Sequence, residues 1–349
     1  MNTPTTSSTT PVRWTLSPDQ AREVVVAASL APSIHNTQPW RWVAVDGGLD
    51  LYADPERQLA VADPAGRQML VSCGAAMLHA RLAVRRLGLT PEVTISPLGD
   101  ENTKTGRAPV GALRIVGATP ATPHEDALVD AMGRRRTDRR PFDGRSVPGD
   151  IVDALRRAAE TEGAWLATVA SPDLRIDTAV LTARADWLEN DDPAYRAELA
   201  RWSRTDPGAV DGIPRDVVVA STGDRAAEFV MRDFDVAGDA GLRVGGTDVE
   251  RPTVVIIGTD SDRSTDQVAA GQALERVLLE ATGHGLAASP LGQAVDVNST
   301  RALLAAAAGG LGHIQMLVRI GYPQAGAQPL AATPRRPIGE FFSTLEVPR

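Results

Sequence analysis

Residues 31–40 of the chain, APSIHNTQPW, follow an apolar helical pattern and lead into the alternating run 40–45, WRWVAV. The segment places two side-chain amides, a hydroxyl and an imidazole in one helix-to-strand connection, on Asn36, Gln38, Ser33 and His35. Amides both donate and accept hydrogen bonds, so this loop suits the edge of a flat heterocycle whose donors and acceptors alternate, such as a flavin. A capped helix end followed by a turn explains the loop equally well, because Asn, Ser and Pro are ordinary turn residues.

The composition is that of a globular protein, with 43% hydrophobic and 23% charged residues. Its 349 residues are enough for about two domain-sized units or one large one. A formal net charge of −8 argues against a general nucleic-acid or anionic-membrane binder, because either needs a net basic face. Cys73 is the sole cysteine, which excludes an intrachain disulfide and a multi-cysteine metal site. The polar start lacks an apolar signal core, and no apolar run approaches the roughly 18 residues of a membrane span, so we expect a cytoplasmic protein.

The first half of the chain, residues 1–122, reads as an alternation of helices and strands. Ser17 is predicted to cap a helix that runs to about residue 30, with Pro18 at its first position and Gln20 closing a capping box. Gly88 is a natural left-handed cap after a long apolar helix. The other elements expected here are a hairpin over 40–45 and 49–53, the long helix over 65–87, and strands at 93–96 and 112–116.

The second half, residues 123–349, repeats this alternation with a long interruption. Residues 172–250 are predicted to form a polar, partly helical insertion with Trp187, Tyr195 and Trp202 on one apolar stripe. Insertions of this length in compact domains are often lids or binding loops, although peripheral packing is nearly as good an interpretation. The remaining expected elements are helices over 125–132, 149–160, 265–284 and 299–308, strands over 164–170, 252–258 and 313–320, and an extended Pro-rich tail.

The two long helices can be overlaid with one constant offset in residue number. Matching residues are Gly74, Ala76, Leu82, Gly88 and Leu89 in the first helix and Gly271, Ala273, Leu279, Gly285 and Leu286 in the second. Amphipathicity alone does not place glycines in register at both ends, so the pattern indicates an internal duplication. The halves differ in what they keep, because only the first has the 31–40 loop and only the second has the run RRRTDRR at 134–140.

Four segments resemble the FMN-dependent nitroreductase superfamily, and more narrowly its Acg-like branch, in which one polypeptide mimics the usual pair of subunits. They are the 31–40 loop, the Arg-Arg-Thr-x-Arg run at 135–139, the stretch 285–293 that contains SPLGQ, and the C-terminal RRPIGEFF at 335–342. The resemblance implies an α+β, nitroreductase-like fold of two related α/β halves. Each half would have a mostly antiparallel sheet flanked by helices, with long core helices and a lid-like inserted segment.

The same resemblance implies one composite FMN site, because in that family one subunit supplies the Arg cluster and the other supplies the Pro-Ser loop. A single chain would then suffice for the site, although further dimerisation stays open. The cofactor-binding residues it implies are Pro32, Ser33, His35, Asn36, Gln38, Arg135, Arg136, Thr137, Arg139, Pro290, Leu291, Gly292, Gln293, Arg335 and Arg336.

Guanidinium groups bind phosphate bidentately and stay charged, so the Arg residues of both clusters are candidates for the FMN phosphate. An isolated Arg run is otherwise a solvated face near a helix end, the interpretation we keep for Arg134 and Arg140. Residues 290–293 are predicted to offer backbone N–H groups to the flavin edge, or to be a plain loop between helices. Many family members carry an acidic residue at the position where this chain has Gly292. This departure from the family pattern would affect which electron acceptor the site admits.

No side chain needs to act as a nucleophile or general base, because the flavin carries the hydride. His35 could donate a proton to a product, but we favour a hydrogen bond to the flavin. No two histidines have ligand spacing, so a metal site is not expected. Two functions follow: an oxidoreductase that moves electrons from NAD(P)H through FMN to a nitroaromatic, quinone or similar small-molecule acceptor, or a low-turnover protein that holds FMN beneath a lid.

Overall fold

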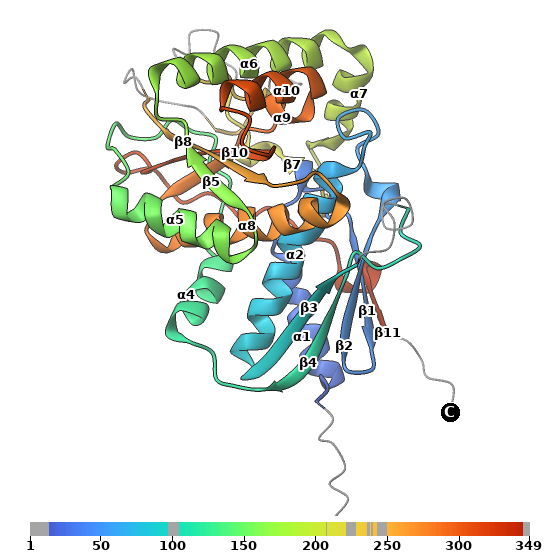
Figure 1. Ribbon diagram of the computed structural model, residues 1–349. Coiled ribbons are helices and arrows are strands. Elements are labelled where there is room, and N and C mark those ends of the chain that lie inside the picture. The colour runs from blue at the N-terminus through green and yellow to red at the C-terminus, as the bar shows by residue number, and fades with distance from the viewer. Residues whose placement is uncertain are drawn as a thin grey trace, which may run out of the picture.

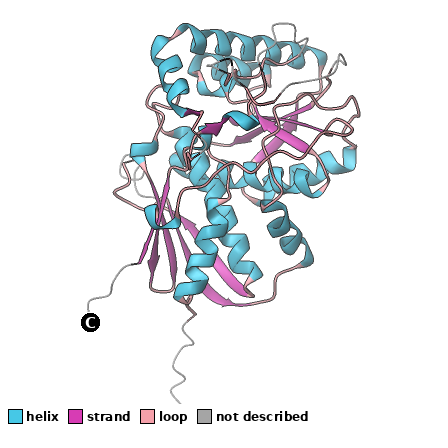
Figure 2. Ribbon diagram, turned by 180° about the vertical axis from the view of Figure 1, so that it is seen from behind, coloured by secondary structure: helices cyan, strands magenta, loops and turns pink. Residues whose placement is uncertain are grey.

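The computed structural model contains two β-sheets with helices packed between and around them, an α+β architecture (Figures 1 and 2). It describes residues 14–96, 105–206, 208–220, 228–235, 238, 240–242 and 250–344. The first sheet has the strand order β11-β1-β2-β4-β3 and the second has the order β5-β8-β10-β9. The bounds of these strands are β1 Trp40–Val45, β2 Gly48–Ala53, β3 Leu89–Ile95, β4 Gly111–Ala118, β5 Trp165–Thr168, β8 Thr253–Thr259, β9 Ala287–Pro290, β10 His313–Gly321 and β11 Phe342–Thr344.

The first sheet is mixed and the second is antiparallel throughout. Strand β11, from the C-terminal tail, pairs in parallel with β1, with Trp42 opposite Phe342. Figure 1 shows this red strand beside the blue one at the edge of the sheet. The sequence predicted the tail as extended but not as a strand, because a segment of three residues carries no periodic signal.

The helices begin and end close to their predicted positions. Helix α1 has the predicted capping box, in which the Gln20 N–H donates to Ser17 Oγ at 3.2 Å and the Ser17 N–H donates to Gln20 Oε1 at 2.9 Å. The helices are α1 Pro18–Ser29, α2 Arg67–Arg86, α4 Pro123–Met132, α5 Gly149–Thr161, α6 Pro172–Asp191, α7 Pro193–Trp202, α8 Ser264–Gly283, α9 Gln293–Asp296 and α10 Asn298–Ala307. Short 3-10 turns cover Ile34–Asn36, Pro55–Arg57, Arg215–Val217 and Ile338–Glu340, and two-residue strands β6 Ser203–Arg204 and β7 Ile213–Pro214 pair with each other.

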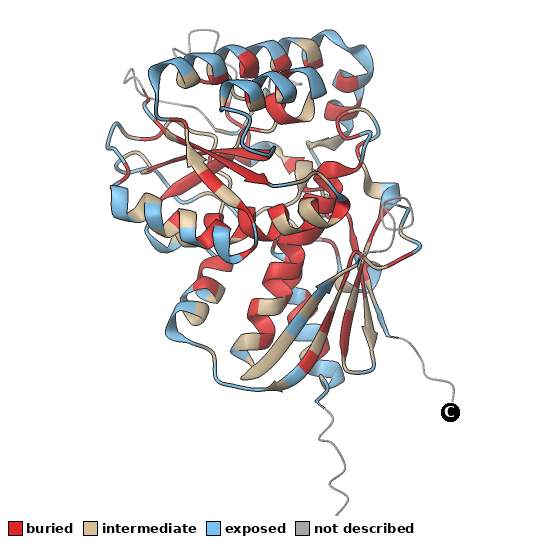
Figure 3. Ribbon diagram, viewed as in Figure 1, coloured by how far each residue is buried: buried red, intermediate tan, exposed pale blue. Residues whose placement is uncertain are grey.

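Helices α2 and α8 cross in the centre of the molecule. All but three of the 20 residues of α2 are buried, and Figure 3 shows the helix almost wholly in the buried colour. Gly74 and Gly271 lie at the crossing, where a Cβ on Gly74 would stand 2.1 Å from the Val268 carbonyl oxygen. Any larger residue would force the helices apart, so this close packing requires glycine.

The two parts of the chain follow the same order of elements: a helix, two strands, a long helix and two strands. These are α1, β1, β2, α2, β3 and β4 in the first part and α5, β5, β8, α8, β9 and β10 in the second. Their strand orders correspond, β1-β2-β4-β3 and β5-β8-β10-β9, and the 172–250 insertion falls between β5 and β8. Gly88 and Gly285 follow the two long helices with positive φ of 74° and 72°, as left-handed caps.

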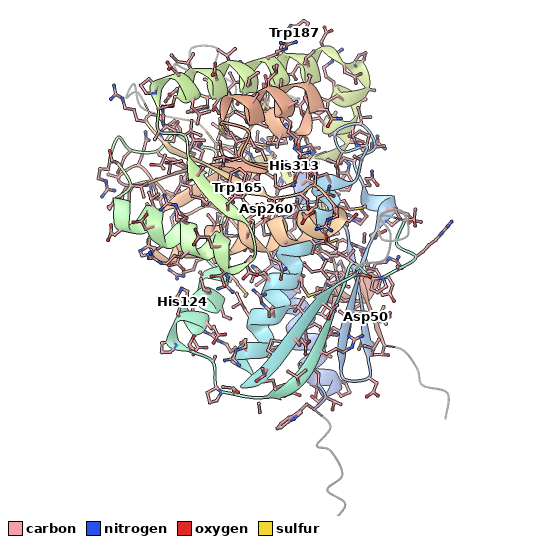
Figure 4. The ribbon with its side chains drawn as sticks, in the orientation of Figure 1. Asp50, His124, Trp165, Trp187, Asp260 and His313 are labelled. Atoms are coloured by element: carbon pink, nitrogen blue, oxygen red, sulfur yellow. The ribbon has the colours of Figure 1, made fainter. Side chains whose placement is uncertain are left out.

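The aromatic residues predicted to share one stripe of the insertion do not do so. Trp187 is 63% exposed and Figure 4 shows it at the outer edge of the molecule, whereas Tyr195 is buried. The helical periodicity breaks at Asp192, which is extended (φ −80°, ψ 114°) because it precedes Pro193. Trp187 and Tyr195 therefore belong to two separate helices, α6 and α7. Part of the Gly-rich stretch from Gly241 to Gly246 lies outside the described residues.

The histidines are dispersed over the fold. His79 is fully buried and His284 ends α8. His313, which is labelled in Figure 4, is exposed at the start of β10. Within the described ranges, no cluster of His, Cys, Asp and Glu side chains is placed to hold a metal ion. The helices of that same part of the chain include none with the length and apolar character needed to cross a membrane.

Candidate functional site

The connection between α1 and β1 holds three residues in left-handed backbone conformations: His35 at φ 45°, Asn36 at φ 54° and Gln38 at φ 50°. Such conformations are unfavourable for residues with side chains and persist only where the surroundings fix them. Distant segments supply that restraint here. The Asn36 amide donates to the Gly212 carbonyl oxygen at 3.0 Å, and the Gln38 amide donates to the Val210 carbonyl oxygen at 3.0 Å.

These contacts give the two amides a different role from the one expected. Gln38 is fully buried, and its Oε1 accepts the Arg336 backbone N–H at 2.9 Å. The Asn36 Oδ1 accepts a hydrogen bond from Arg335 at 3.2 Å. Both amides therefore hold protein segments together, and Gln38 does not present an open edge to a heterocycle.

A cavity opens beside this loop, between α2, α8 and β10. Its apolar walls include Val71 of α2, Leu274 of α8 and Met316 of β10. Ser33 and His35 bring polar groups from the loop. The lining also includes Pro32, Gln68, Thr137, Arg139, Met231, Arg232, Phe234, Pro290, Gly292, Gln293 and Asp296.

A second cavity is lined by four arginines, Arg135, Arg136, Arg139 and Arg335. Burial and the positive charges of Arg135 and Arg136 lower the pKa of Arg335 to about 9. Burial and the charge of Arg135 also lower the pKa of Arg136. An opposing charge is supplied by Glu275, whose Oε1 lies 3.4 Å from Arg135 Nε. Positive charge is thus concentrated here, and a bound anion would relieve the mutual repulsion.

The two cavities adjoin, because five residues line both of them. These are Pro32, Ser33, His35, Thr137 and Arg139. The first three come from the α1–β1 loop and the last two from the segment after α4, so the structure brings together the two regions that the sequence analysis paired. A β-bridge between Thr137 and Ala288 holds that segment against β9.

The stretch 290–293 contributes three of its four residues to the first cavity: Pro290, Gly292 and Gln293. Leu291 is fully buried in the core, and its N–H donates to the Leu317 carbonyl oxygen at 2.8 Å. The prediction that Leu291 offers its backbone N–H to a ligand is therefore wrong. The Leu291 N–H instead joins this stretch to β10.

The C-terminal arginine pair separates into two roles. Arg335 lines the second cavity, whereas Arg336 lines neither. The Arg336 guanidinium donates to the Gln38 carbonyl oxygen at 3.1 Å and to Glu340 Oε2 at 3.2 Å, so it holds the loop and does not face the cavity. In the other cluster, Arg134 is exposed, as the solvated-face interpretation expects. Arg140 departs from it, because its side chain is only 18% exposed and pairs with Asp138 at 2.7 Å.

The 172–250 insertion, predicted as a lid or as peripheral packing, contributes Met231, Arg232 and Phe234 to the wall of the first cavity, although the sequence did not single out these three residues. Arg232 is largely buried, with 10% of its side chain exposed, and pairs with Glu189 at 2.7 Å and Asp296 at 3.1 Å. No signal pointed to it, because an arginine within a polar stretch is usually solvated. The rest of the insertion includes a peripheral helix, since α6 lies on the outside of the molecule with α9 and α10 beneath it (Figure 1).

Comparison with known proteins identifies the family. The chain is 33% identical over 325 residues to "Putative NAD(P)H nitroreductase Rv3131" of Mycobacterium tuberculosis H37Rv, covering 92% of this chain and 90% of the relative. It is also 33% identical over 328 residues to "Putative NAD(P)H nitroreductase acg" of the same strain, covering 93% and 95%. The chain belongs to the nitroreductase superfamily. Its similarity to Acg agrees with the branch that the sequence motifs resemble.

Other comparisons with the nitroreductase superfamily are more distant. No protein-family model matches the chain. Among solved structures, the FMN-dependent nitroreductase NfnB from Mycobacterium smegmatis in complex with NADPH is 16% identical to it. That match covers 62% of this chain and 97% of the other, with a TM-score of 0.36.

Proposed function

We propose that this nitroreductase-superfamily protein binds FMN across the two adjoining cavities and passes electrons from NAD(P)H to a small-molecule acceptor such as a nitroaromatic or a quinone. The observation that carries the proposal is the continuity of an apolar cavity with a second cavity that is lined by four arginines. FMN has the matching form, a flat ring joined through a ribityl chain to a phosphate dianion. The names of the relatives support NAD(P)H as the reductant.

The residues present suit this cofactor. The Nε atom of Arg136 is buried and has no hydrogen-bond acceptor among the described residues, whereas that of Arg135 has only the contact of 3.4 Å with Glu275. Buried donors rarely stay unpaired, so these atoms favour an anionic ligand such as a phosphate. The apolar residues Val71, Leu274 and Met316 give the first cavity the character of a slot for an aromatic ring.

Each group of residues has a distinct task in the proposed function. Arg135, Arg136 and Arg335 would bind the phosphate. Arg139 lines both cavities and would place positive charge beside the ring, which stabilises negative charge that develops there on reduction. When bound, FMN supplies the hydride chemistry itself, so no side chain has to act as nucleophile or general base.

We propose as well that the site is composite and formed within one chain, at the junction of two duplicated halves, residues 1–122 and 123–349. The matching order of elements and strands supports the duplication. The contact of Gly74 with Gly271 supports it too, because these two residues were equivalent in the sequence overlay. The loop of one half and the Arg segment of the other then complete a single site.

A second function is supported by the insertion. Met231, Arg232 and Phe234 occupy the wall of the first cavity, where a second substrate would need access to the flavin ring. A protein whose insertion stays in place would hold FMN and turn over slowly. This alternative predicts the same cofactor and differs only in reactivity.

One anaerobic experiment separates these functions. The purified protein is scanned for flavin absorbance, NADH or NADPH is added, and a nitroaromatic or quinone follows. Rapid bleaching followed by reoxidation supports the oxidoreductase, whereas a tightly bound flavin that stays oxidised supports the holding function. A folded protein that neither carries nor takes up FMN would overturn both.

A further inference from the structure

Arg232, from the insertion, and His35, from the α1–β1 loop, make a direct hydrogen bond of 3.1 Å between an Arg232 terminal nitrogen and His35 Nε2. A guanidinium has five N–H donors and no acceptor, and it keeps its proton in proteins. The nitrogen that faces it must therefore offer a lone pair. This contact requires His35 Nε2 to be unprotonated.

The surroundings of His35 also disfavour the imidazolium form. The ring is buried, and its edge-to-face neighbour is Phe234, with centroids 5.4 Å apart. Burial first, and then the positive charges of Arg232 and Arg139, hold the pKa of His35 well below its ordinary value. His35 is therefore neutral, and its single ring proton must lie on Nδ1.

That remaining N–H lacks a protein acceptor. His35 Nδ1 is buried and makes no hydrogen bond to any residue in the described part of the chain. His35 lines both cavities, so a ligand that spans them would lie against this ring. A buried donor without an acceptor is costly, and a ligand that supplies one would bind more tightly for it.

Arg232 cannot turn away to bind a ligand itself, because carboxylates on two helices hold it. Its other terminal nitrogen binds Glu189 of α6 at 2.7 Å and Asp296 of α9 at 3.1 Å. Asp296 is fixed in turn by Arg67 at 3.1 Å and by the Gln68 amide at 2.7 Å. The guanidinium is thus oriented by its anchors before it meets His35.

We infer that Arg232 is a positioning residue that keeps His35 as its neutral Nδ1–H tautomer, and that this N–H is a hydrogen-bond donor to an acceptor atom of the bound flavin. The inference rests on the proposed function for its ligand, while the tautomer itself is a property of the protein alone. It gives the insertion a chemical role beyond covering the cavity, because Arg232 determines which ring nitrogen can donate.

The tautomer can be read by long-range proton–nitrogen NMR of uniformly labelled protein, with the His35 signals assigned from the variant His35→Gln. The wild-type protein should carry its His35 proton on Nδ1 alone between about pH 5 and 8, with and without FMN. Glu189 would also titrate in this pH range, because burial raises the pKa of its carboxyl to about 7 against the opposing effect of Arg232. The variant Glu189→Gln is the control, since it removes this titration and keeps the contact between Arg232 and His35.

The test variant is the double change Glu189→Gln with Arg232→Met, which removes both members of the buried ion pair and so leaves neither charge alone. Asp296 keeps its contacts with Arg67 and Gln68 in this variant. His35 should then populate the Nε2–H tautomer and show a higher pKa than in the Glu189→Gln control. A double variant with the same His35 spectrum as the control, or wild-type protein with the proton on Nε2, would overturn the inference.

Addition of FMN tests the donor role separately. Binding should shift the resonance of the His35 Nδ1 proton, and a bound flavin that leaves this resonance unchanged would overturn the assignment of the donor. If the protein binds no FMN at all, the proposed function and the donor role fail together. The tautomer assignment would then be decided by the spectra recorded without FMN.

Discussion

Gly74 of α2 and Gly271 of α8 pack directly against each other, each facing a backbone carbonyl of the opposite helix. A Cβ on Gly74 would lie 2.1 Å from the Val268 oxygen, and one on Gly271 would lie 2.0 Å from the Val71 oxygen. Backbone atoms cannot move aside as a flexible side chain can. We therefore predict that Gly74→Ala lowers the free energy of unfolding by about 3 kcal/mol or more, measured by urea denaturation.

The matched control is Gly283→Ala, at the end of α8. A Cβ on Gly283 would meet nothing within 4 Å, so this change should be neutral or stabilise the protein by up to about 1 kcal/mol through helix propensity. Equal unfolding free energies for the two variants would mean that the helices do not cross this closely.

The phosphate assignment can be tested by comparing FMN with riboflavin, which lacks the phosphate. Arg136→Ala should weaken FMN binding by about 10- to 100-fold, because a charge-assisted contact is lost. Riboflavin affinity should change little. Arg136 is partly exposed, and its guanidinium has no carboxylate partner among the described residues, so its removal leaves no buried charge unpaired. Fluorescence titration of flavin-free protein gives both affinities.

Arg134→Ala is the control for net charge in this experiment. Arg134 lies two residues away, is exposed, and donates to the Asp130 carbonyl oxygen at 3.3 Å. This variant should bind both flavins as the wild type does. If Arg136→Ala weakens FMN and riboflavin equally, Arg136 does not contact the phosphate.

The elements of the fold could be predicted largely because their signals are local. The capping box of Ser17 and Gln20 and the left-handed Gly88 each depend on residues within a turn of one another. Strand β11 could not be predicted, because its pairing with β1 joins opposite ends of the chain. The break between α6 and α7 had a signal in Pro193, which the apparent aromatic stripe obscured.

In the candidate site, the sequence indicated the regions better than the individual roles. A motif gives residue types, whereas the direction of a side chain depends on tertiary contacts. Gln38 and Arg336 bind each other's backbone instead of the cavity, and Leu291 faces the core. Arg232 could not be found at all, because its burial depends on carboxylates of two other helices.

Asp63 should make the stability of the protein fall as the pH rises. Its carboxylate accepts the backbone N–H groups of Gln68 at 3.1 Å and Met69 at 2.8 Å, yet burial raises its pKa from 3.8 to about 6. The folded state keeps this proton over a range in which the unfolded chain has lost it. The stabilisation, on the order of 2–3 kcal/mol, is complete below about pH 4 and is lost as the pH rises through about 6.

The variant Asp63→Asn isolates this effect, because asparagine does not titrate. The unfolding free energy of the wild type minus that of the variant should decrease from about pH 4 to 7 and then become constant. Chemical denaturation at several pH values measures it. A difference that stays flat or grows over this interval would show that Asp63 is ionised in the folded protein.

The protein should bind about one FMN for each chain, and a monomer should be sufficient, because the α1–β1 loop and the arginine segment after α4 meet at the two cavities within one chain. A second site is not expected at the corresponding α5–β5 connection, where Glu162 is buried and pairs with both Arg81 and Arg276. That carboxylate would repel a phosphate and already occupies the guanidinium groups. Light scattering after gel filtration, combined with the absorbance of released flavin, gives the mass and the stoichiometry together. Flavin found only in a dimeric fraction, or two flavins per chain, would contradict a single site within one chain.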